Sequence, residues 1–555
     1  MSGNNKKKGG NSFLVQGGIL AMAGIISRLI GVVYRVPLLN IMTVRGQGFY
    51  EVAFQIYQIA LLLTSYSLPL AVSKLVSARL AKGEKKNAYR VFKTALTFAF
   101  LVGLAAALII FFGAGFIAGK VMSLSLSSYA LRVLAPGLIL VAVMGVLRGY
   151  FQGLGTMIPT AVSQILEQIV NAVVSLVGAS LFMGYGETAA KAQGDELLGA
   201  AYSAAGGTLG TVIGALIGLI FLALIFFSYK GRLKRQLRSD RSAHRESYRY
   251  ILKIMILTVA PVILSSAVYN LQNVLDNAMF NNIMMAQGHT ESDCSLLVGK
   301  IGQYYTLFSV PLAIANALAS SLIPSLVATV QSKERRRIHQ KIYTVIRMTM
   351  LIAIPSAMGF FVLARPIMDL LFRTDNEVQA MLLRIGAVSV VFYCLSTVTS
   401  AVLQGLNRMM APVKNAAISL VIHLVSLFLM LVVFKWGVYA VIVSKVIFSI
   451  IMCIMNAHDI REAVGYVQEQ RKTFVIPSIA SGIMGIVTFV VYLVLDIFIG
   501  GRIATVLALI IAVITYGVSL LLLGGLSEDE ILEMPKGATL VTFLRRLHLL
   551  KGEYY

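Results

Sequence analysis

The chain has 555 residues, of which 58% are hydrophobic and only 13% are charged, and its formal net charge is +24 at pH 7. A soluble domain of this size could not bury so large a share of apolar side chains, so a soluble globular protein is excluded. Apolar runs of about 20 residues, the length of a helix that crosses a bilayer, recur from end to end. The sequence therefore predicts an all-α polytopic membrane protein.

Fourteen apolar segments follow one another along the chain, and we expect each of them to form a transmembrane helix. They cover residues 13–39, 48–78, 92–118, 128–151, 160–184, 199–229, 251–285, 300–330, 343–372, 379–406, 412–434, 437–457, 474–499 and 502–525. No small-residue cleavage site follows the first apolar run, so we expect a retained first span rather than a signal peptide. The three cysteines are far apart and odd in number, so no disulfide framework is expected.

Every second loop is rich in lysine and arginine, whereas the loops between them are acidic or nearly neutral. The basic stretches are residues 6–8, 79–90, 230–249 and 333–341. Because basic loops remain in the cytoplasm, we expect both termini there. We attribute these charges to membrane topology and to contact with anionic lipid headgroups. No nucleic-acid partner is expected, because no aromatic residues interleave with the arginines as a single-strand binder requires.

The sequence contains an internal repeat. Q-G-L-G, from Gln152, recurs as Q-G-L-N, from Gln404, and L-P-L-A-V-S-K-L-V, from Leu68, recurs as I-P-S-L-V-A-T-V, from Ile323. A repeat unit of six spans predicts two six-helix lobes related by an axis along the membrane normal, with a cavity between them and two additional C-terminal helices. The expected domains are an N-terminal lobe (1–229), a basic cytoplasmic linker (230–250), a C-terminal lobe (251–457), two further spans (474–525) and a cytoplasmic tail (526–555).

The sequence carries no catalytic constellation. It lacks a G-x-x-x-x-G-K-[ST] phosphate loop, an H-E-x-x-H motif and a cysteine–histidine metal cluster. We therefore expect a transporter without a resident cofactor or metal rather than an enzyme. Such a transporter would use an ion gradient or the membrane potential instead of ATP hydrolysis.

Two arginines, Arg28 and Arg35, lie inside the first apolar segment. Seven residues apart on a helix, they face the same way at a distance of about 10 Å. A guanidinium group in hydrocarbon is normally retained only where it lines a water-filled cavity or meets an anion. Arg28 is too deep to reach either surface, which favours a cavity-lining role. Arg35 could instead reach the outer interface, and Glu51 lies close enough in depth to pair with it.

Further ionisable residues lie within later apolar segments. For Lys74 and Arg148, near the inner ends of their segments, substrate contact and simple anchoring at the cytoplasmic interface both stay open. Asp276 could coordinate an ion or form a structural hydrogen bond. Lys445 lies near the midplane and is costly to bury, which indicates cavity lining. Two other residues are interpreted as structural, one bonded to a neighbouring helix and one packed in the interior: Glu167 and His423.

With these residues, the chain resembles the polysaccharide-export branch of the multidrug/oligosaccharidyl-lipid/polysaccharide exporter superfamily. Within it, the chain is similar to the group of stage V sporulation protein B and the lipid II flippases. The specific motifs are G-V-V-Y-R-V-P-L (31–38), G-Q-G-F-Y (46–50), L-P-L-A-V-S-K-L-V (68–76) and R-G-Y-F-Q-G (148–153). The resemblance implies a V-shaped cationic cavity between two lobes and translocation of an undecaprenyl-pyrophosphate-linked sugar.

The resemblance also implies roles for individual residues. First-helix arginines of lipid II flippases meet the pyrophosphate; Arg28, in S-R-L-I-G, matches directly, whereas Arg35 is one residue out of register. Val36 stands where the family usually has an acidic residue, and residues 303–311 lack the family's arginine before a proline. By the same resemblance, Asp276 is the candidate for a sodium site.

We therefore expect a flippase in the bacterial cytoplasmic membrane. It would move an undecaprenyl-pyrophosphate-linked glycan, lipid II or a related cell-wall precursor, from the inner to the outer leaflet by alternating access, with sodium or proton coupling left open. Its partners would be the lipid-linked oligosaccharide, membrane lipids and cell-wall synthesis proteins, in vegetative growth or sporulation. The candidate substrate-binding residues are Arg28, Arg35, Glu51, Lys74, Arg148 and Lys445, and the candidate ion-binding residue is Asp276.

Other functions stay open at this point. The substrate could be another lipid-linked polysaccharide. An ion-coupled multidrug antiporter could use the same lobes, but export of cationic drugs calls for an acidic or aromatic cavity, whereas the deep charges here are mostly arginine and lysine. A membrane scaffold that recruits wall-synthesis enzymes without transport would not need these charges at all.

Overall fold

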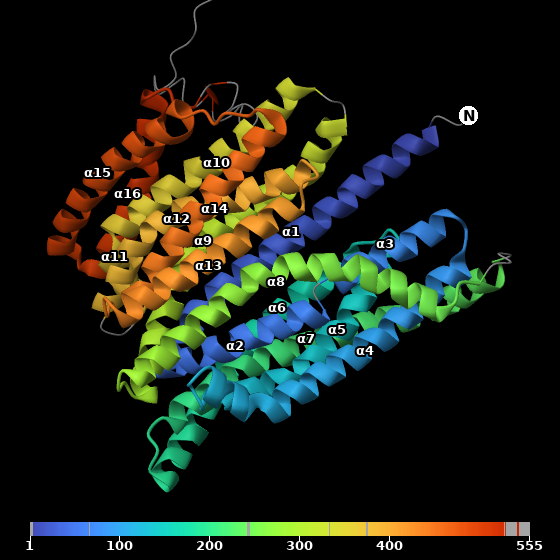
Figure 1. Cartoon of the computed structure of the whole chain (residues 1–555), viewed down its shortest axis with the longest axis horizontal. Helices are drawn as coiled ribbons and strands as arrows, with labels where there is room; N and C mark the ends of the chain where they lie inside the picture. The colour runs from blue at the N-terminus through green and yellow to red at the C-terminus, as the bar shows by residue number, and fades with distance from the viewer. Residues whose placement is uncertain are drawn as a thin grey trace, which may run out of the picture. The chain divides into compact units, whose positions relative to one another are not determined.

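The computed structural model describes residues 4–65, 67–240, 245–331, 334–372, 376–526, 528, 541 and 542; for residues 4–18, 21, 261, 262, 264–269, 321, 324, 325, 328 and 331 it describes the backbone alone. In this part of the chain the regular structure is helical throughout (Figure 1). Twelve helical segments among the described residues are long and apolar enough to cross a membrane. The prediction of an all-helical, multi-pass membrane protein is confirmed.

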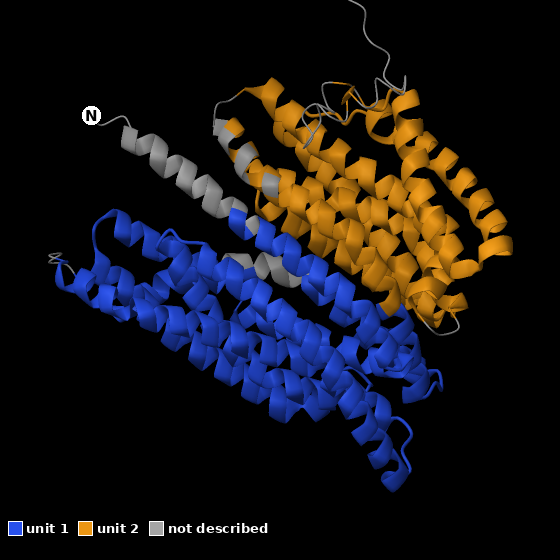
Figure 2. Cartoon of the chain, turned by 180° about the vertical axis from the view of Figure 1, so that it is seen from behind, with its two compact units in different colours: residues 1–302 blue, residues 303–555 orange. Residues whose placement is uncertain are grey.

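The helices fall into two compact units, residues 1–302 and 303–555, coloured blue and orange in Figure 2. Unit 1 contains α1 (Asn4–Ile41), α2 (Val44–Thr64), α3 (Leu68–Ala81), α4 (Lys85–Phe116), the short π-helix η1 (Ile117–Val121), α5 (Ser127–Gly153), α6 (Ile158–Gln193), α7 (Leu198–Arg238), α8 (Tyr248–Ala286) and the first turns of α9 (Glu291–Gln331). Unit 2 contains the rest of α9, α10 (Arg335–Val362), α11 (Ala364–Leu371), α12 (Glu377–Gly405), α13 (Met410–Val432), α14 (Val438–Val464), η2 (Arg471–Val475), α15 (Ile476–Ile499) and α16 (Gly501–Leu522).

The two units are defined by contacts between helices, whereas the expected lobes are defined by the sequence repeat. Helix α8 packs against α2, α3 and α4, so it is counted with unit 1 although it opens the second repeat. The lobe boundaries 1–229 and 251–457 therefore stay a prediction.

Two predicted segments are each formed by two helices. The segment 48–78 contains α2 and α3, and the segment 343–372 contains α10 and α11. Helix α3 begins just before Pro69, which has no backbone N–H to continue the hydrogen-bond ladder of α2. The predicted segments 251–285 and 300–330 correspond to α8 and α9. Both contain side chains outside the described set, so the count of fourteen spans stays a prediction.

The L-P-L-A-V-S-K-L-V motif on α3 packs directly against the R-G-Y-F-Q-G motif on α5. A Cβ atom at Gly149 would lie 2.6 Å from the carbonyl oxygen of Pro69, and one at Gly153 would lie 2.8 Å from the Cβ of Val76. Only glycine permits this separation, and small residues at helix interfaces allow backbones in a membrane to approach closely. The two motifs therefore form one helix–helix contact, to which each contributes one surface.

The structure of unit 2 repeats the end of α5 at the end of α12. Gly155 and Asn407 both have a left-handed backbone, with φ of +86° and +64°. Each amide donates to the carbonyl three residues earlier, at 3.0 and 3.1 Å, and the following amide donates to the carbonyl five residues earlier, at 3.1 and 2.9 Å. A Cβ at Gly405 would lie 2.9 Å from Leu326, a contact of the same kind as that between α5 and α3. The internal repeat thus extends to the hydrogen bonds of the helix ends.

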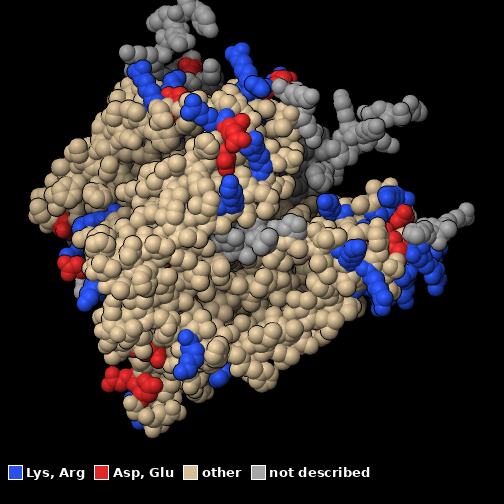
Figure 3. Space-filling view, in the orientation of Figure 1, with Lys and Arg blue, Asp and Glu red and all other residues tan. Residues whose placement is uncertain are grey.

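Two acidic residues bond the connection between α7 and α8 to the C-terminal end of α3 and to the N-terminal end of α4. Glu246 forms an ion pair with Arg79 at 2.6 Å. Asp240, which is 6% exposed, accepts a hydrogen bond from the backbone amide of Lys86 at 2.6 Å. On the face drawn in Figure 3, lysine and arginine gather near helix ends and the helix sides carry few charges. The linker was predicted from its basic residues, but its acidic residues make these contacts.

We expect Gly149→Ala to lower the thermal stability of the detergent-solubilised protein. The added methyl group must displace the backbone of Pro69, and overpacking of this kind typically costs about 1–3 kcal/mol. The matched control is Gly184→Ala on α6, where a Cβ atom meets nothing within 4 Å and alanine is the better helix former. Thermal unfolding followed by circular dichroism measures the difference, and equal melting temperatures for the two variants would contradict the close contact.

Candidate functional site

The predicted pairing of Arg35 with Glu51 is present. The Arg35 guanidinium on α1 donates to Oε1 of Glu51 on α2. The Glu51 side chain is 8% exposed and that of Arg35 is 28% exposed. Thr43, between the two helices, caps α2 by accepting the amide of Gly46 at 3.2 Å. The ion pair links α1, which packs against α6, to α2, which packs against α5, α7 and α8.

Glycines on α2 and α9 make room for this ion pair. A Cβ atom at Gly302 on α9 would lie 2.8 Å from the Cγ of Glu51. One turn before Glu51, Gly48 lies against the backbone of Ser295, and Gly299 lies against the backbone of Val44. The G-Q-G-F-Y motif therefore permits α2 and the start of α9 to approach at backbone distance, which encloses the carboxylate.

A polar network on α6 continues from the ion pair. Asn171 donates to the hydroxyl of Tyr34, the neighbour of Arg35, at 3.1 Å. The same amide donates to Gln168 at 3.1 Å, and Ser175 donates to Asn171 at 3.0 Å. This network was missed in the sequence. The spacing of Gln164, Gln168, Asn171 and Ser175, by three or four residues, is the signal that would have placed them on one helix face.

Glycines of α7 hold α6 in this position. A Cβ atom at Gly214 would lie 2.7 Å from the carbonyl oxygen of Glu167, and Gly206 lies directly against Gly178. Ser175 of the polar network lies against Gly210 of α7, whereas Asn171 also reaches Tyr34 of α1. Consistent with this, Gln168 lies beside Gly31 of α1, 3.4 Å from the position of a Cβ atom there.

Arg148 on α5 forms a second ion pair within unit 1. Its guanidinium bonds to Glu167 of α6 at 2.7 Å and to the hydroxyl of Ser163 at 2.9 Å. The two charged side chains are 13% and 25% exposed. The expectation that Glu167 bonds to a neighbouring helix is confirmed. Arg148 thus has a structural partner, and its role in substrate binding stays a prediction.

Arg28 and Lys74 are both exposed. Arg28 lies within the apolar segment Met22–Ile41 of α1 and has no ion-pair partner among the described residues. Lys74 lies at the middle of α3 (Leu68–Ala81). The structure therefore joins Arg35 to Glu51. Arg28, on the same helix as Arg35, is not part of this ion pair.

The acidic candidate Asp276 is 2% exposed on α8. The next residue, Asn277, donates to Gln55 of α2 at 2.6 Å, so this part of α8 is bonded to α2. In the described part of the chain, no group of three or more histidine, cysteine, aspartate or glutamate side chains could hold a metal ion. Ion binding at Asp276 stays a prediction.

In unit 2, Lys445 on α14 is 5% exposed and its ammonium lies 4.7 Å from the centre of the Tyr305 ring on α9. A cation over an aromatic face is attracted by the ring electrons, and the attraction grows when water is excluded. His423 on α13 is fully buried with its ring edge-on to Phe448, at 6.0 Å between centroids. This agrees with the interpretation of His423 as a packing residue.

The chain is similar in sequence to known protein families and to individual bacterial proteins. The sequence profile of the polysaccharide biosynthesis protein family matches residues 14–330, and the MatE profile matches residues 261–429. Over 418 residues the chain is 26% identical to the lipid II flippase MurJ of Bacillus subtilis (strain 168), covering 73% of this chain and 75% of that protein. Over 404 residues it is 26% identical to stage V sporulation protein B of the same organism, covering 72% and 74%.

A solved structure of a lipid II flippase MurJ has the same fold. The TM-score is 0.62 at 14% sequence identity, over 90% of this chain and 97% of that one. At this identity the likeness concerns the fold alone.

We expect Arg35 and Glu51 to be energetically coupled. Arg35→Ala leaves a buried carboxylate without its partner, and breaking a buried pair costs up to about 3–5 kcal/mol, less here because Arg35 is partly exposed. Removing Glu51 as well should restore part of that stability. A double-mutant cycle by thermal unfolding measures the coupling, expected at about 0.5–3 kcal/mol.

The control cycle combines Glu51→Ala with Arg28→Ala. Arg28 lies on α1, seven residues before Arg35. The effects of these two changes should add, because Arg28 does not contact Glu51. Additive effects in both cycles would show that the Arg35–Glu51 contact contributes nothing.

Proposed function

Because the chain belongs to the polysaccharide biosynthesis protein family, whose members are membrane transporters of the multidrug/oligosaccharidyl-lipid/polysaccharide exporter superfamily, we propose that it is a flippase for a polyprenyl-pyrophosphate-linked glycan. The glycan would move from the inner to the outer leaflet of a bacterial cytoplasmic membrane. The observation that carries the proposal is Arg28, an exposed guanidinium inside a helix that is apolar enough to span a membrane. Such a charge is retained where it meets an anion.

The chemistry of α1 suits a pyrophosphate. Guanidinium groups bind phosphate oxygens through paired N–H donors, and this bonding is strong where water is excluded. The charge of Arg35 is balanced by Glu51, so the pair adds little net charge, but the buried Nε of Arg35 has no hydrogen-bond partner among the described residues. In this proposal Arg28 supplies the charge that attracts the anion, and Arg35 supplies an oriented donor.

The finer topology belongs to the same proposal. We infer fourteen spans, two six-helix lobes related by an axis along the membrane normal, and both termini in the cytoplasm. The basic loops and the repeated helix ends at Gly155 and Asn407 support this arrangement. Alternating access of the two lobes would then expose the site to each leaflet in turn, with Asp276 as the candidate site for a coupling sodium ion or proton. Lys74, Arg148 and Lys445 remain candidates for further substrate contacts.

Within this proposal, lipid II or a related cell-wall precursor is the substrate that the relatives' names favour. The lipid II flippase MurJ and stage V sporulation protein B of Bacillus subtilis cover comparable parts of the chain at the same identity. Either a vegetative or a sporulation role is compatible with them.

An ion-coupled multidrug antiporter is the second candidate function. The MatE match over residues 261–429 favours it. The charges of the first two helices are unfavourable for an antiporter of cationic drugs. Arg28 would repel such a drug, and the carboxylate of Glu51 is already paired. A resistance profile of an overexpressing strain separates the two functions, since only the antiporter should raise tolerance to cationic drugs.

We expect the chain to sustain growth of a bacterium depleted of its own lipid II flippase. The measurement is colony formation after depletion, with membrane expression verified by immunoblot. The Gly184→Ala variant serves as a folded, active control because a Cβ atom at that position would meet nothing within 4 Å. Failure of a well-expressed copy would remove lipid II as the substrate and leave another lipid-linked glycan.

We expect Arg28→Ala to lower transport of a labelled polyprenyl-pyrophosphate disaccharide in proteoliposomes by about tenfold or more. This is the range that loss of hydrogen bonds to a charged group produces. Arg28→Lys should recover only part of the rate, because an ammonium cannot make the two-pronged contact. Both variants should insert and fold normally, since Arg28 has no ion-pair partner among the described residues. Normal transport by Arg28→Ala would refute the role given to this residue.

A further inference from the structure

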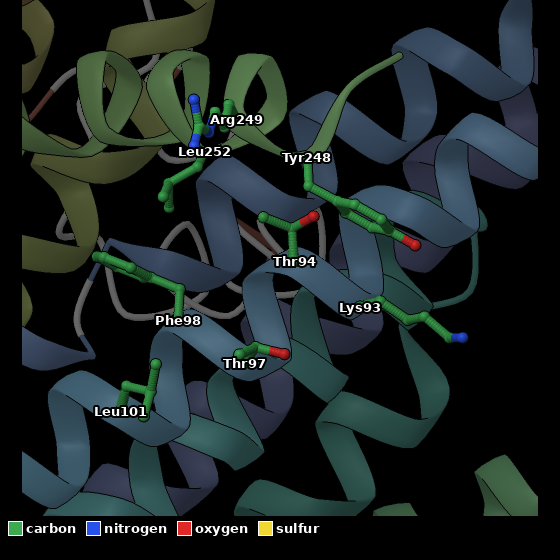
Figure 4. A pocket seen from close by; sticks show the side chains of 8 residues that line it. All are labelled: Lys93, Thr94, Thr97, Phe98, Leu101, Tyr248, Arg249 and Leu252. Carbon is green, nitrogen blue, oxygen red and sulfur yellow. The ribbon is translucent and has the colours of Figure 1, made fainter. Parts of the chain in front are cut away.

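A groove of about 460 Å³ lies between α4 and the start of α8, entirely within unit 1 (Figure 4). Its apolar wall includes Phe98 and Leu101 of α4 and Leu252 of α8. Two cations, Lys93 and Arg249, stand at its edges, and Figure 4 shows their charged ends directed away from the apolar side chains. The groove thus combines an apolar interior with a positively charged rim.

The rim is held in place by stacked cations and rings. The guanidinium of Arg90 lies 4.3 Å from the centre of the Tyr248 ring, and Tyr248 lines the groove. The ammonium of Lys93 lies 5.2 Å from the centre of the Tyr89 ring. The buried Nε of Arg90 has no hydrogen-bond partner among the described residues. Both helices therefore contribute a cation to the rim of the groove, Lys93 from α4 and Arg249 from α8.

The nearby acidic residues are already bonded. Glu246 is paired with Arg79, and Asp240 accepts from Lys86. These carboxylates therefore do not neutralise Lys93 and Arg249. An anion is the charge that complements the rim.

The apolar interior continues onto the exposed sides of the two helices. Phe100 and Leu101 of α4 are 47% and 58% exposed, and Ile256 and Leu257 of α8 are 44% and 63% exposed. Helix α4 belongs to a segment apolar enough to cross a membrane. A hydrocarbon chain that begins in the groove can therefore run along α4 and α8 within the bilayer, whereas a soluble anion would leave this surface uncovered.

We propose that this groove binds an anionic glycerophospholipid, with its headgroup at the basic rim that carries Lys93 and Arg249 and an acyl chain along Phe98, Leu101 and Leu252. The lipid comes from the leaflet that faces the basic loops 79–90 and 230–249, where anionic headgroups are attracted. A lipid held by α4 and α8 together links α8, which follows the connection from α7, to α4 within unit 1. This site is separate from the transported substrate and does not rest on its identity.

The test compares phosphatidylglycerol with phosphatidylcholine, by titration of each into the purified full-length protein and native mass spectrometry of the bound lipid. The wild-type protein should retain phosphatidylglycerol in preference to phosphatidylcholine. Each lysine or arginine near an anionic surface is worth about fivefold in affinity, so Lys93→Ala/Arg249→Ala should weaken phosphatidylglycerol binding about 25-fold. Binding of phosphatidylcholine should not change.

The matched control is Lys234→Ala/Arg235→Ala, which removes the same charge from exposed positions at the end of α7. It should retain wild-type binding. A second variant, Thr97→Trp, keeps every cation but fills the groove with an indole ring, and it should also lose phosphatidylglycerol.

Three results would overturn the proposal. Equal loss in the control would reduce the effect to general surface charge. Unchanged binding in Thr97→Trp, with the protein folded by size-exclusion chromatography, would exclude the groove as the site. Displacement of phosphatidylglycerol by soluble glycerol phosphate, at equal concentration, would mean that the acyl chain is not recognised.

Discussion

The ion pair between Arg35 and Glu51 joins the first two helices of unit 1. Helix α1 packs against α6, and α2 packs against α5, α7 and α8. The pair bonds α1 directly to α2 inside an apolar environment, where an unpartnered charge is costly. Tyr34 and Asn171 extend the same polar contact to α6, and Gly302 of α9 closes over the carboxylate. The position of the first helix, and hence of Arg28, depends on this contact.

Close contacts between helices permit such an ion pair in the apolar interior of a membrane. Within unit 1, α7 meets α6, α2 meets α9 and α3 meets α5 at positions where a glycine removes the Cβ atom from one side. Backbone contact at these positions leaves little empty space and fixes the rotation of each helix. For α6, this rotation turns Gln168 and Asn171 toward α1 and places Glu167 within reach of Arg148. Interfaces of small residues thus determine where the polar groups meet.

The sequence allowed the class of protein, the helical segments and one ion pair to be predicted, for physical reasons. Apolar runs and basic loops report directly on the membrane, and Glu51 matches Arg35 in depth. The break between α2 and α3 was missed because both halves are apolar, although Pro69 marks it. The partner of Arg148 and the network around Asn171 depend on the rotation of α5 and α6, which is set by tertiary contacts with glycines of α7. The acidic contacts of Asp240 and Glu246 were hidden in a loop dominated by basic residues.

The backbone contact between α3 and α5 has a consequence for motion. At Gly149 and Pro69 no side chain stands between the two helices, so no change of rotamer could let one slide past the other. We therefore expect α3 and α5 to move together in any conformational cycle of this unit. Helix α2 ends at Thr64 and α3 begins at Leu68, where the regular ladder is interrupted. We expect bending of the predicted second span to occur between these two helices, because α3 is in backbone contact with α5.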